Sequence, residues 1–201
     1  MMNRYCLLSV IVASLLSIPG HAQSQSRESR ESRDSMMREL EEVARVATVM
    51  VDGDVCQRIM TERALKKLFV VDPEDQWAGA DNFDVNAEPF IQTKKTLMRL
   101  AKLRPYPIDC NLWMLFKEKP RQIQILIRNQ YEMSRFWTWG VLLQDISPEM
   151  AEVLSSGKSK TVTGKDDLIA VLTPVFNSLG EIVGLVEVVG RARMNWQENV
   201  K

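Results

Sequence analysis

The chain has 201 residues, 45% of them hydrophobic, with 26 basic and 26 acidic side chains and one histidine, His21. This length suits a single domain with a sizeable core. The balanced charge argues against a nucleic-acid-binding protein and gives no obvious polybasic patch for a membrane. Because the rest of the chain has no histidine, Ser-His-Asp catalysis, Cys-His catalysis and ordinary zinc sites have no basis there.

Residues 1–22 have the three-part layout of a cleavable signal peptide. Arg4 supplies the positive charge, residues 7–18 are largely apolar, and the small residues Gly20 and Ala22 occupy positions −3 and −1 of the predicted cut. The apolar run is shorter than the roughly 20 residues that span a bilayer. We therefore expect a periplasmic or secreted protein, with an uncleaved anchor helix as the alternative.

The mature chain is predicted to contain one domain between two polar segments. Residues 23–35 have no apolar side chain to bury, which predicts a flexible leader. Residues 36–191 form the predicted binding domain, and residues 192–201 form a polar tail. No later stretch is apolar enough to cross a membrane, so we expect no direct span after the signal is removed.

Helical spacing of apolar residues dominates the first half of the domain. It predicts one long helix from about residue 36 to 69, kinked near Gly53, and a second helix over residues 87–103. Between them, residues 72–86 form an acidic loop. The spacing of its carboxylates does not match a calcium-binding EF-hand, so we expect no metal and no cofactor.

Two cysteines, Cys56 and Cys110, remain after the signal is removed. In an oxidising compartment, such a pair favours a disulfide. The alternative is two separate buried thiols, because sequence spacing cannot show that the two Cα atoms lie close enough for a bridge.

The second half changes to the two-residue period of strands. The expected elements are a strand at 123–127, a strand at 134–144, a short helix between Ser147 and Gly157, a strand at 159–163, and a hairpin of 168–176 with 182–189. Together with the N-terminal helices, these strands predict an α+β fold in which helices pack on an antiparallel sheet.

The order of these elements resembles the extracytoplasmic Cache family, the PAS-like sensor domains of bacterial receptors. The nearest match is residues 168–191, LIAVLTPVFNSLGEIVGLVEVVGR, in which a turn containing Gly180 joins two apolar strands. The resemblance implies a PAS-like sheet with a ligand held against it by aromatic and charged side chains. Family members usually continue into a membrane helix after the last strand, whereas this sequence ends at Lys201, which favours a stand-alone binder or a subunit of a larger assembly.

The predicted strand 134–144 carries the candidate ligand site. Arg135, Trp137 and Trp139 share one face of it, where the arginine can hold a carboxylate and the indoles can enclose the rest of a ligand. The alternative is a core strand whose tryptophans pack under the helices. Three residues that flank the strand, Arg128, Tyr131 and Asp145, are predicted to line the same pocket.

A last acidic residue, Glu187, interrupts the final apolar strand, and we expect it to be exposed at a sheet edge rather than buried with a partner. No nucleophile, phosphate-binding or dinucleotide motif is present, so we expect no enzymatic activity. The sequence predicts an exported, sensor-like domain in signal transduction that binds a small organic ligand, such as an amino acid or organic acid, and that has a membrane receptor or other protein as partner. The alternatives are a periplasmic assembly subunit and, less favoured, a carboxylate-based hydrolase.

Overall fold

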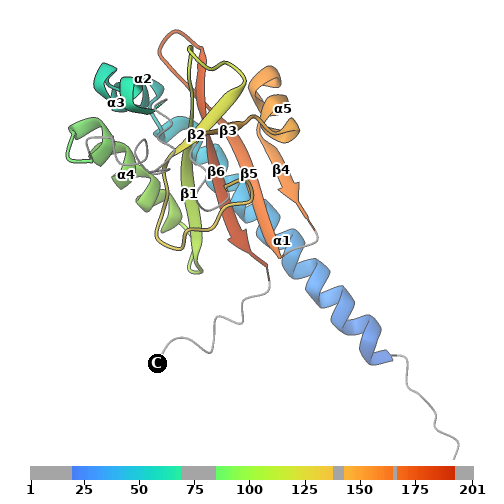
Figure 1. Ribbon diagram of the computed structural model, residues 1–201. Coiled ribbons are helices and arrows are strands. Elements are labelled where there is room, and N and C mark those ends of the chain that lie inside the picture. The colour runs from blue at the N-terminus through green and yellow to red at the C-terminus, as the bar shows by residue number, and fades with distance from the viewer. Residues whose placement is uncertain (1–19, 69–84, 138–142, 165–166, 193–201) are drawn as a thin grey trace, which may run out of the picture.

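The computed structural model describes residues 20–68, 85–137, 143–164 and 167–192 (Figure 1). Six antiparallel strands in the order β3-β2-β1-β6-β5-β4 form one sheet. The predicted α+β fold class is therefore confirmed. The strands are β1 (Ile108–Leu115), β2 (Gln122–Ile127), β3 (Leu143–Asp145), β4 (Lys160–Thr163), β5 (Leu168–Phe176) and β6 (Ile182–Arg191).

Helices cover the two faces of this sheet unequally. On one face, α1 crosses β5 and β6, and α4 lies along β1, while α5 packs on the opposite face against β4, β5 and β6. Figure 1 shows the N-terminal part of α1 projecting well beyond the sheet. The helices are α1 (Gly20–Met50), α2 (Gly53–Ile59), α3 (Glu62–Leu68), α4 (Glu88–Ala101) and α5 (Pro148–Ser156). Among the described residues, no helix is both long and apolar enough to cross a lipid bilayer.

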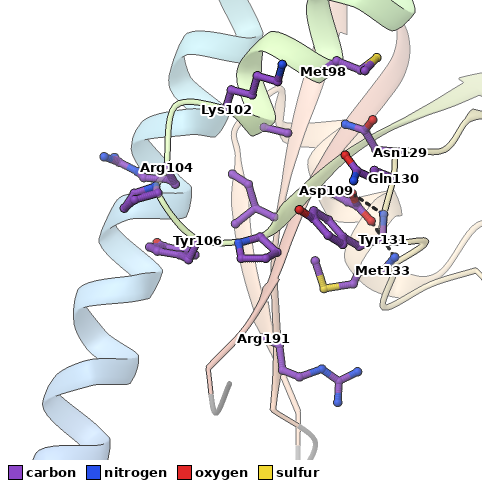
Figure 2. Close-up of a pocket in the computed structure, with 14 residues that line it drawn as sticks. Met98, Lys102, Arg104, Tyr106, Asp109, Asn129, Gln130, Tyr131, Met133 and Arg191 are labelled. Atoms are coloured by element: carbon purple, nitrogen blue, oxygen red, sulfur yellow. Dashed lines mark hydrogen bonds between the residues drawn. The ribbon is translucent and has the colours of Figure 1, made fainter. Parts of the chain in front are cut away.

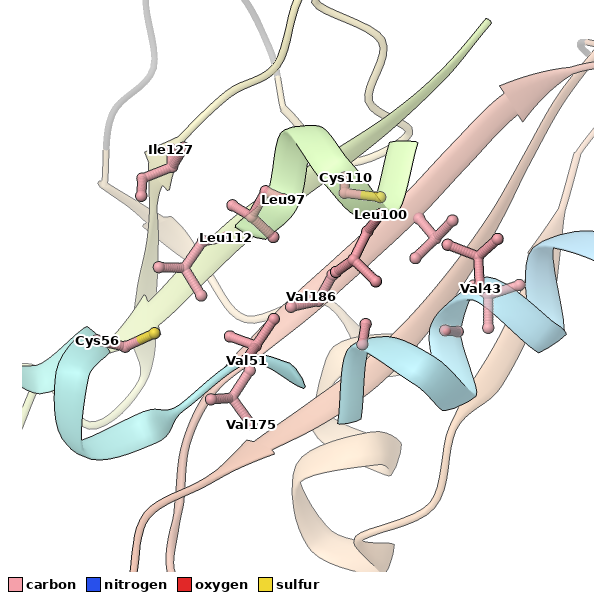
Figure 3. Close-up of a cluster of buried hydrophobic side chains, with 14 of the residues drawn as sticks. Val43, Val51, Cys56, Leu97, Leu100, Cys110, Leu112, Ile127, Val175 and Val186 are labelled. Atoms are coloured by element: carbon pink, nitrogen blue, oxygen red, sulfur yellow. The ribbon is translucent and has the colours of Figure 1, made fainter. Parts of the chain in front are cut away.

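The face beneath α1 and α4 holds the larger hydrophobic core (Figure 3). Because strand side chains alternate, Leu112 of β1 and Val186 of β6 point toward the helices, where Leu40 of α1 and Leu97 of α4 meet them. All four side chains are fully buried. This layer fixes the helices on the sheet by the burial of apolar surface.

The predicted long helix over residues 36–69 is broken into three pieces. The side chain of Asp52 accepts hydrogen bonds from the backbone N–H groups of Asp54 (2.9 Å) and Val55 (3.2 Å), so it caps a new helix. A Cβ atom at Gly53 would lie 2.4 Å from the carbonyl oxygen of Phe176. The break thus follows from a side-chain cap and a close approach to the β5–β6 hairpin, neither of which the apolar spacing reveals.

The structure also extends α1 through residues 23–35, the predicted flexible leader. Within that segment no glycine or proline interrupts the helix, and opposite charges recur four residues apart, which supports helix formation without apolar residues. Arg33 ties the end of the segment to the domain by donating to the carbonyl oxygen of Gly164 (3.2 Å). Residues 1–19, most of the predicted signal peptide, and residues 193–201 of the predicted tail lie outside the described residues, as do residues 69–84 of the acidic region.

The C-terminal elements are confirmed. The Ser147 hydroxyl caps α5 by accepting from the N–H of Met150 (3.2 Å), and Gly157 ends the helix in the left-handed conformation, with φ 67°. The hairpin of β5 and β6 turns at Gly180, whose φ is 77°. Two differences remain: β1 was not predicted, and within the predicted strand 134–144 the described residues 134–137 form a loop.

The two cysteines are free, buried thiols rather than the favoured disulfide. Figure 3 shows them at separate places in the helix-covered core, with the side chains of Leu97 and Leu112 nearby. The Cys56 sulfur on α2 lies 4.0 Å from the Thr93 hydroxyl, whereas Cys110 lies on β1. Burial raises the pKa of the Cys56 thiol to about 12, so it stays protonated and unreactive in the folded state.

Candidate functional site

The face of the sheet opposite α1 and α4 carries a row of buried polar side chains. Asp109 and Asn111 of β1 and Glu187 of β6 are at most 1% exposed. Asn111 and Glu187 are direct cross-strand partners, so their side chains lie side by side. These central strands bring together carboxylate and amide groups that are distant in the sequence.

Glu187 accepts four hydrogen bonds. Its Oε2 accepts hydrogen bonds from Asn111 Nδ2 (3.3 Å), Trp113 Nε1 (3.0 Å) and Ser134 Oγ (2.7 Å). Its Oε1 accepts one from the backbone N–H of Arg135 (2.7 Å). Complete burial raises the pKa of Glu187 above its ordinary value, and these donors partly oppose the rise by favouring the carboxylate. The network anchors the loop that follows β2 to the middle of the sheet.

Asp109 and Asn111 anchor the earlier part of the same loop. Asp109 accepts from the backbone N–H groups of Tyr131 (3.2 Å) and Met133 (2.8 Å), one on each carboxylate oxygen. Asn111 donates to the Met133 carbonyl (2.7 Å) and accepts from the N–H of Asn129 (3.3 Å). Between these contacts Glu132 has a φ of 51°, a left-handed conformation that is unfavourable for a residue with a Cβ atom. Three sheet side chains thus hold residues 129–135 in one shape.

The anchored loop forms one wall of a cleft of about 740 Å³. Its other walls are the end of α4, Lys102 with residues 104–107, and the first residues of β1 (Figure 2). Met98, Tyr131 and Met133 supply apolar surface, and Asn129 and Gln130 supply amide groups. Figure 2 shows Asp109 between β1 and the loop, with dashed lines from its carboxylate to the loop backbone. The cleft therefore combines an apolar lining with a few polar groups on a rigid support.

Not all charged residues of the cleft are free to meet a ligand. Arg104 donates to the backbone carbonyl of Glu39 (3.1 Å) and to the Glu42 carboxylate (2.5 Å), both on α1. The Tyr106 hydroxyl donates to the Glu39 carboxylate (2.8 Å). Lys102 and Arg191 are exposed at the rim instead. The rim therefore provides positive charge to an anionic group, while Arg104 and Tyr106 brace the wall against α1.

A half-buried lysine, Lys94, lies behind the loop. Its ammonium group donates to the backbone carbonyl of Arg128. Burial lowers the pKa of Lys94, and the nearby Asp109 carboxylate opposes that shift by favouring the charged ammonium. Burial likewise raises the pKa of Asp109, and its two backbone hydrogen bonds and Lys94 oppose that rise. Lys94 and Asp109 thus each hold the loop through hydrogen bonds to its backbone, and the charge of each favours the ionised form of the other.

Two predicted site residues, Arg128 and Trp137, come together. The Arg128 guanidinium lies 4.2 Å from the centre of the Trp137 ring, and it also faces Glu132 at 3.7 Å. Cation–π contact of this kind holds the two ends of the loop together. The sequence had predicted Trp137 on a strand and Arg128 beside it, whereas in the structure both residues lie in the loop that follows β2.

Arg135 has a structural role in the described contacts. Its backbone N–H binds Glu187, and its guanidinium donates to the carbonyl oxygen of Leu168 (2.9 Å). A Cβ atom at Gly164 would lie 2.0 Å from this guanidinium, so the group fits closely against residue 164. Neither Arg135 nor Trp137 lines the 740 Å³ cleft.

The remaining predicted residues are dispersed. Tyr131 lines the cleft and is 49% exposed. Asp145 is exposed on β3, accepts from Gln122 Nε2 (3.4 Å), and lines a different groove beside α5. Trp139 lies outside the described residues. Of the five predicted site residues that the structure describes, Tyr131 alone lines the cleft.

Sequence reasoning missed the three residues that shape the site. Glu187 was expected at a sheet edge, and this expectation is wrong. Strand β6 is flanked by β1 and β5, and the side chain of Glu187 is fully buried. Asp109 and Asn111 were not singled out, although Ile108, Cys110 and Leu112 alternate with them in a two-residue period. That alternation was the available signal for β1.

Among the described residues, no group of three or more histidine, cysteine, aspartate or glutamate side chains is placed to hold a metal ion. Comparison with protein families, curated proteins and solved structures found nothing that matches the chain.

Proposed function

We propose that the protein reversibly binds a small organic ligand in the cleft beside Asp109, without performing chemistry on it. The observation that carries this proposal is the cleft itself. Its volume of about 740 Å³ lies within the roughly 300–1,000 Å³ of small-molecule sites, and its lining of apolar side chains with a few amides is typical of them.

The anchoring of the cleft wall supports binding by a preformed site. Asp109 directs both carboxylate oxygens to the loop backbone, so it acts as a positioning residue for Tyr131 and Met133. A wall whose shape exists before the ligand arrives avoids part of the entropy loss of binding. The exposed face of Tyr131 can stack on the body of the ligand, and Lys102 and Arg191 favour a carboxylate at the rim.

The setting we propose for this binding is extracytoplasmic sensing. The N-terminal segment has the layout of a signal peptide, and the hairpin of β5 and β6 has the sequence that resembles the Cache family. The packing of the N-terminal helices on an antiparallel sheet agrees with this setting. The proposal moves the ligand from Arg135 and the tryptophans, where the sequence had predicted it, to the cleft at Tyr131.

A thermal-shift screen of amino acids, organic acids and amines tests the proposal. A ligand that binds only the folded state raises the Tm in proportion to the logarithm of its concentration once it exceeds its Kd. We expect at least one carboxylate-bearing compound to raise the wild-type Tm. The variant Tyr131→Ala should keep its own Tm, because Tyr131 is half exposed, and should lose most of the shift.

Leu179→Ala is the matched control, because Leu179 is 80% exposed on the β5–β6 turn and does not line the cleft. It should retain the full shift. The proposal is wrong if no compound raises the wild-type Tm, or if Tyr131→Ala and Leu179→Ala respond to the active compound alike.

A further inference from the structure

The charge of this nearly neutral chain is unevenly distributed over its surface. Lys95, Arg99 and Lys102 follow one another at spacings of four and three residues, so they share one face of α4 and the turn after it. All three are exposed, and the described residues form no ion pair with them. Within α4 the one acidic residue is Glu88, at the opposite end of the helix.

Apolar side chains project among these cations. Met98 is 39% exposed and Leu103 is 49% exposed. Together with the three cations they define the basic α4 face: Lys95, Met98, Arg99, Lys102 and Leu103. The opposite side of the helix, with Thr93, Leu97 and Leu100, is buried in the domain.

We propose that the basic α4 face docks the protein on an anionic lipid surface. Clustered lysine and arginine side chains are attracted to the negative headgroups, and their aliphatic stems let them reach that level while neighbouring apolar side chains enter the interface. The exposed side chains of Met98 and Leu103 can add burial of apolar surface in the lipid interface. A purely electrostatic contact with an acidic protein would not need such apolar burial. This surface overlaps the cleft at Met98 and Lys102, so the test substitutes Lys95, Arg99 and Leu103, which do not line it.

The test measures co-sedimentation of the full chain with two kinds of vesicle: phosphatidylcholine alone, and phosphatidylcholine mixed with phosphatidylglycerol. We expect binding to the mixed vesicles and little to the neutral ones. Removing one basic contact should weaken binding roughly fivefold. The double variant Lys95→Glu with Arg99→Glu should therefore lose at least about 25-fold, and its unchanged Tm would show that it is folded.

The matched control reverses the same amount of charge elsewhere. Lys117 follows β1 and Lys158 follows α5, and both are exposed. Lys117→Glu with Lys158→Glu should keep most of the binding. An equal loss in both double variants would show attraction by net charge alone and would overturn the proposal.

A second variant, Leu103→Gln, isolates the apolar part. It should leave the binding at low salt nearly intact but make it fall further at high salt, where charge attraction is screened. Equal binding to both kinds of vesicle, or none to either, contradicts the proposal. Binding to soluble polyglutamate without binding to anionic vesicles also contradicts it and points to an acidic protein as the partner.

Discussion

The two faces of the sheet are built in different ways. Beneath α1 and α4, apolar side chains such as Leu40, Leu97 and Leu112 form a continuous core. On the other face, Asp109 and Glu187 direct carboxylates into a loop and satisfy its backbone. The first face holds helices by burying apolar area, whereas the second gives an irregular segment one defined shape through hydrogen bonds. The difference shows how the same two strands, β1 and β6, can serve both stability and the geometry of the cleft.

The largest expected effect lies on the helix-covered face. Leu40→Ala should lower the free energy of unfolding by about 3–4 kcal/mol, because it removes a fully buried side chain and leaves a cavity between α1 and the sheet. Chemical denaturation followed by circular dichroism measures this. Leu103→Ala, at a half-exposed leucine, should stay within about 0.5 kcal/mol of the wild type. Similar losses in both variants would contradict the assignment of this core.

On the polar face, Glu187→Gln should destabilise the protein by about 2–3 kcal/mol at neutral pH. The substitution conserves size but replaces one carboxylate oxygen with an NH₂ group, which donates and cannot accept. This group must face either the Arg135 N–H, which now binds Oε1, or the three donors that now bind Oε2. The same denaturation experiment measures the loss. Glu181→Gln, at an exposed glutamate, is the control and should have little effect. A stable Glu187→Gln variant would show that the four hydrogen bonds do not hold the loop.

The pH dependence of stability sharpens the same contrast. Burial raises the pKa values of Glu187 and Asp109. The folded state therefore binds the protons of these two carboxyl groups more tightly than the unfolded chain does. Their contribution to stability is fully present below the ordinary carboxyl pKa, about 4–5, and is lost as pH rises through the folded values. Denaturation at several pH values should show the free energy of unfolding falling less steeply with rising pH in Glu187→Gln than in the wild type. Parallel profiles would contradict the buried, raised pKa of Glu187.

The smallest effect is expected at the outer end of the loop. Arg128→Ala should cost about 0.5–1 kcal/mol, because it removes the cation–π contact with Trp137 at a partly exposed position. Arg99→Ala, which removes an arginine without such a contact, should be close to neutral in the same denaturation assay. If Arg128→Ala were as damaging as Leu40→Ala, the loop would be part of the core rather than an anchored surface segment.

Local chemistry in the sequence determined several elements of this fold. The cap at Ser147 and the glycine at 157 predicted α5, and the apolar runs around Gly180 predicted the hairpin of β5 and β6. Each of these signals acts within a few residues, through a hydrogen bond to the backbone or a required turn conformation. The alternation around Leu112 was also present, but Asp109 and Asn111 are uncommon in strands and obscured it.

The tertiary structure alone decided where the polar side chains went. Glu187 has the same local sequence context whether its strand is at an edge or at the centre, and pairing with β1 made it central and buried. Arg135 and Trp137 fit the period of a strand, but in the structure Glu187 accepts from the Arg135 N–H and the Ser134 hydroxyl accepts from the Trp137 N–H, which bends the chain there. The contacts of Glu187 with Ser134 and Arg135 join residues more than 50 positions apart, so the local sequence carries no signal for them. Local signals in the sequence determined α5 and the β5–β6 hairpin, and the order of the strands determined which of their side chains meet.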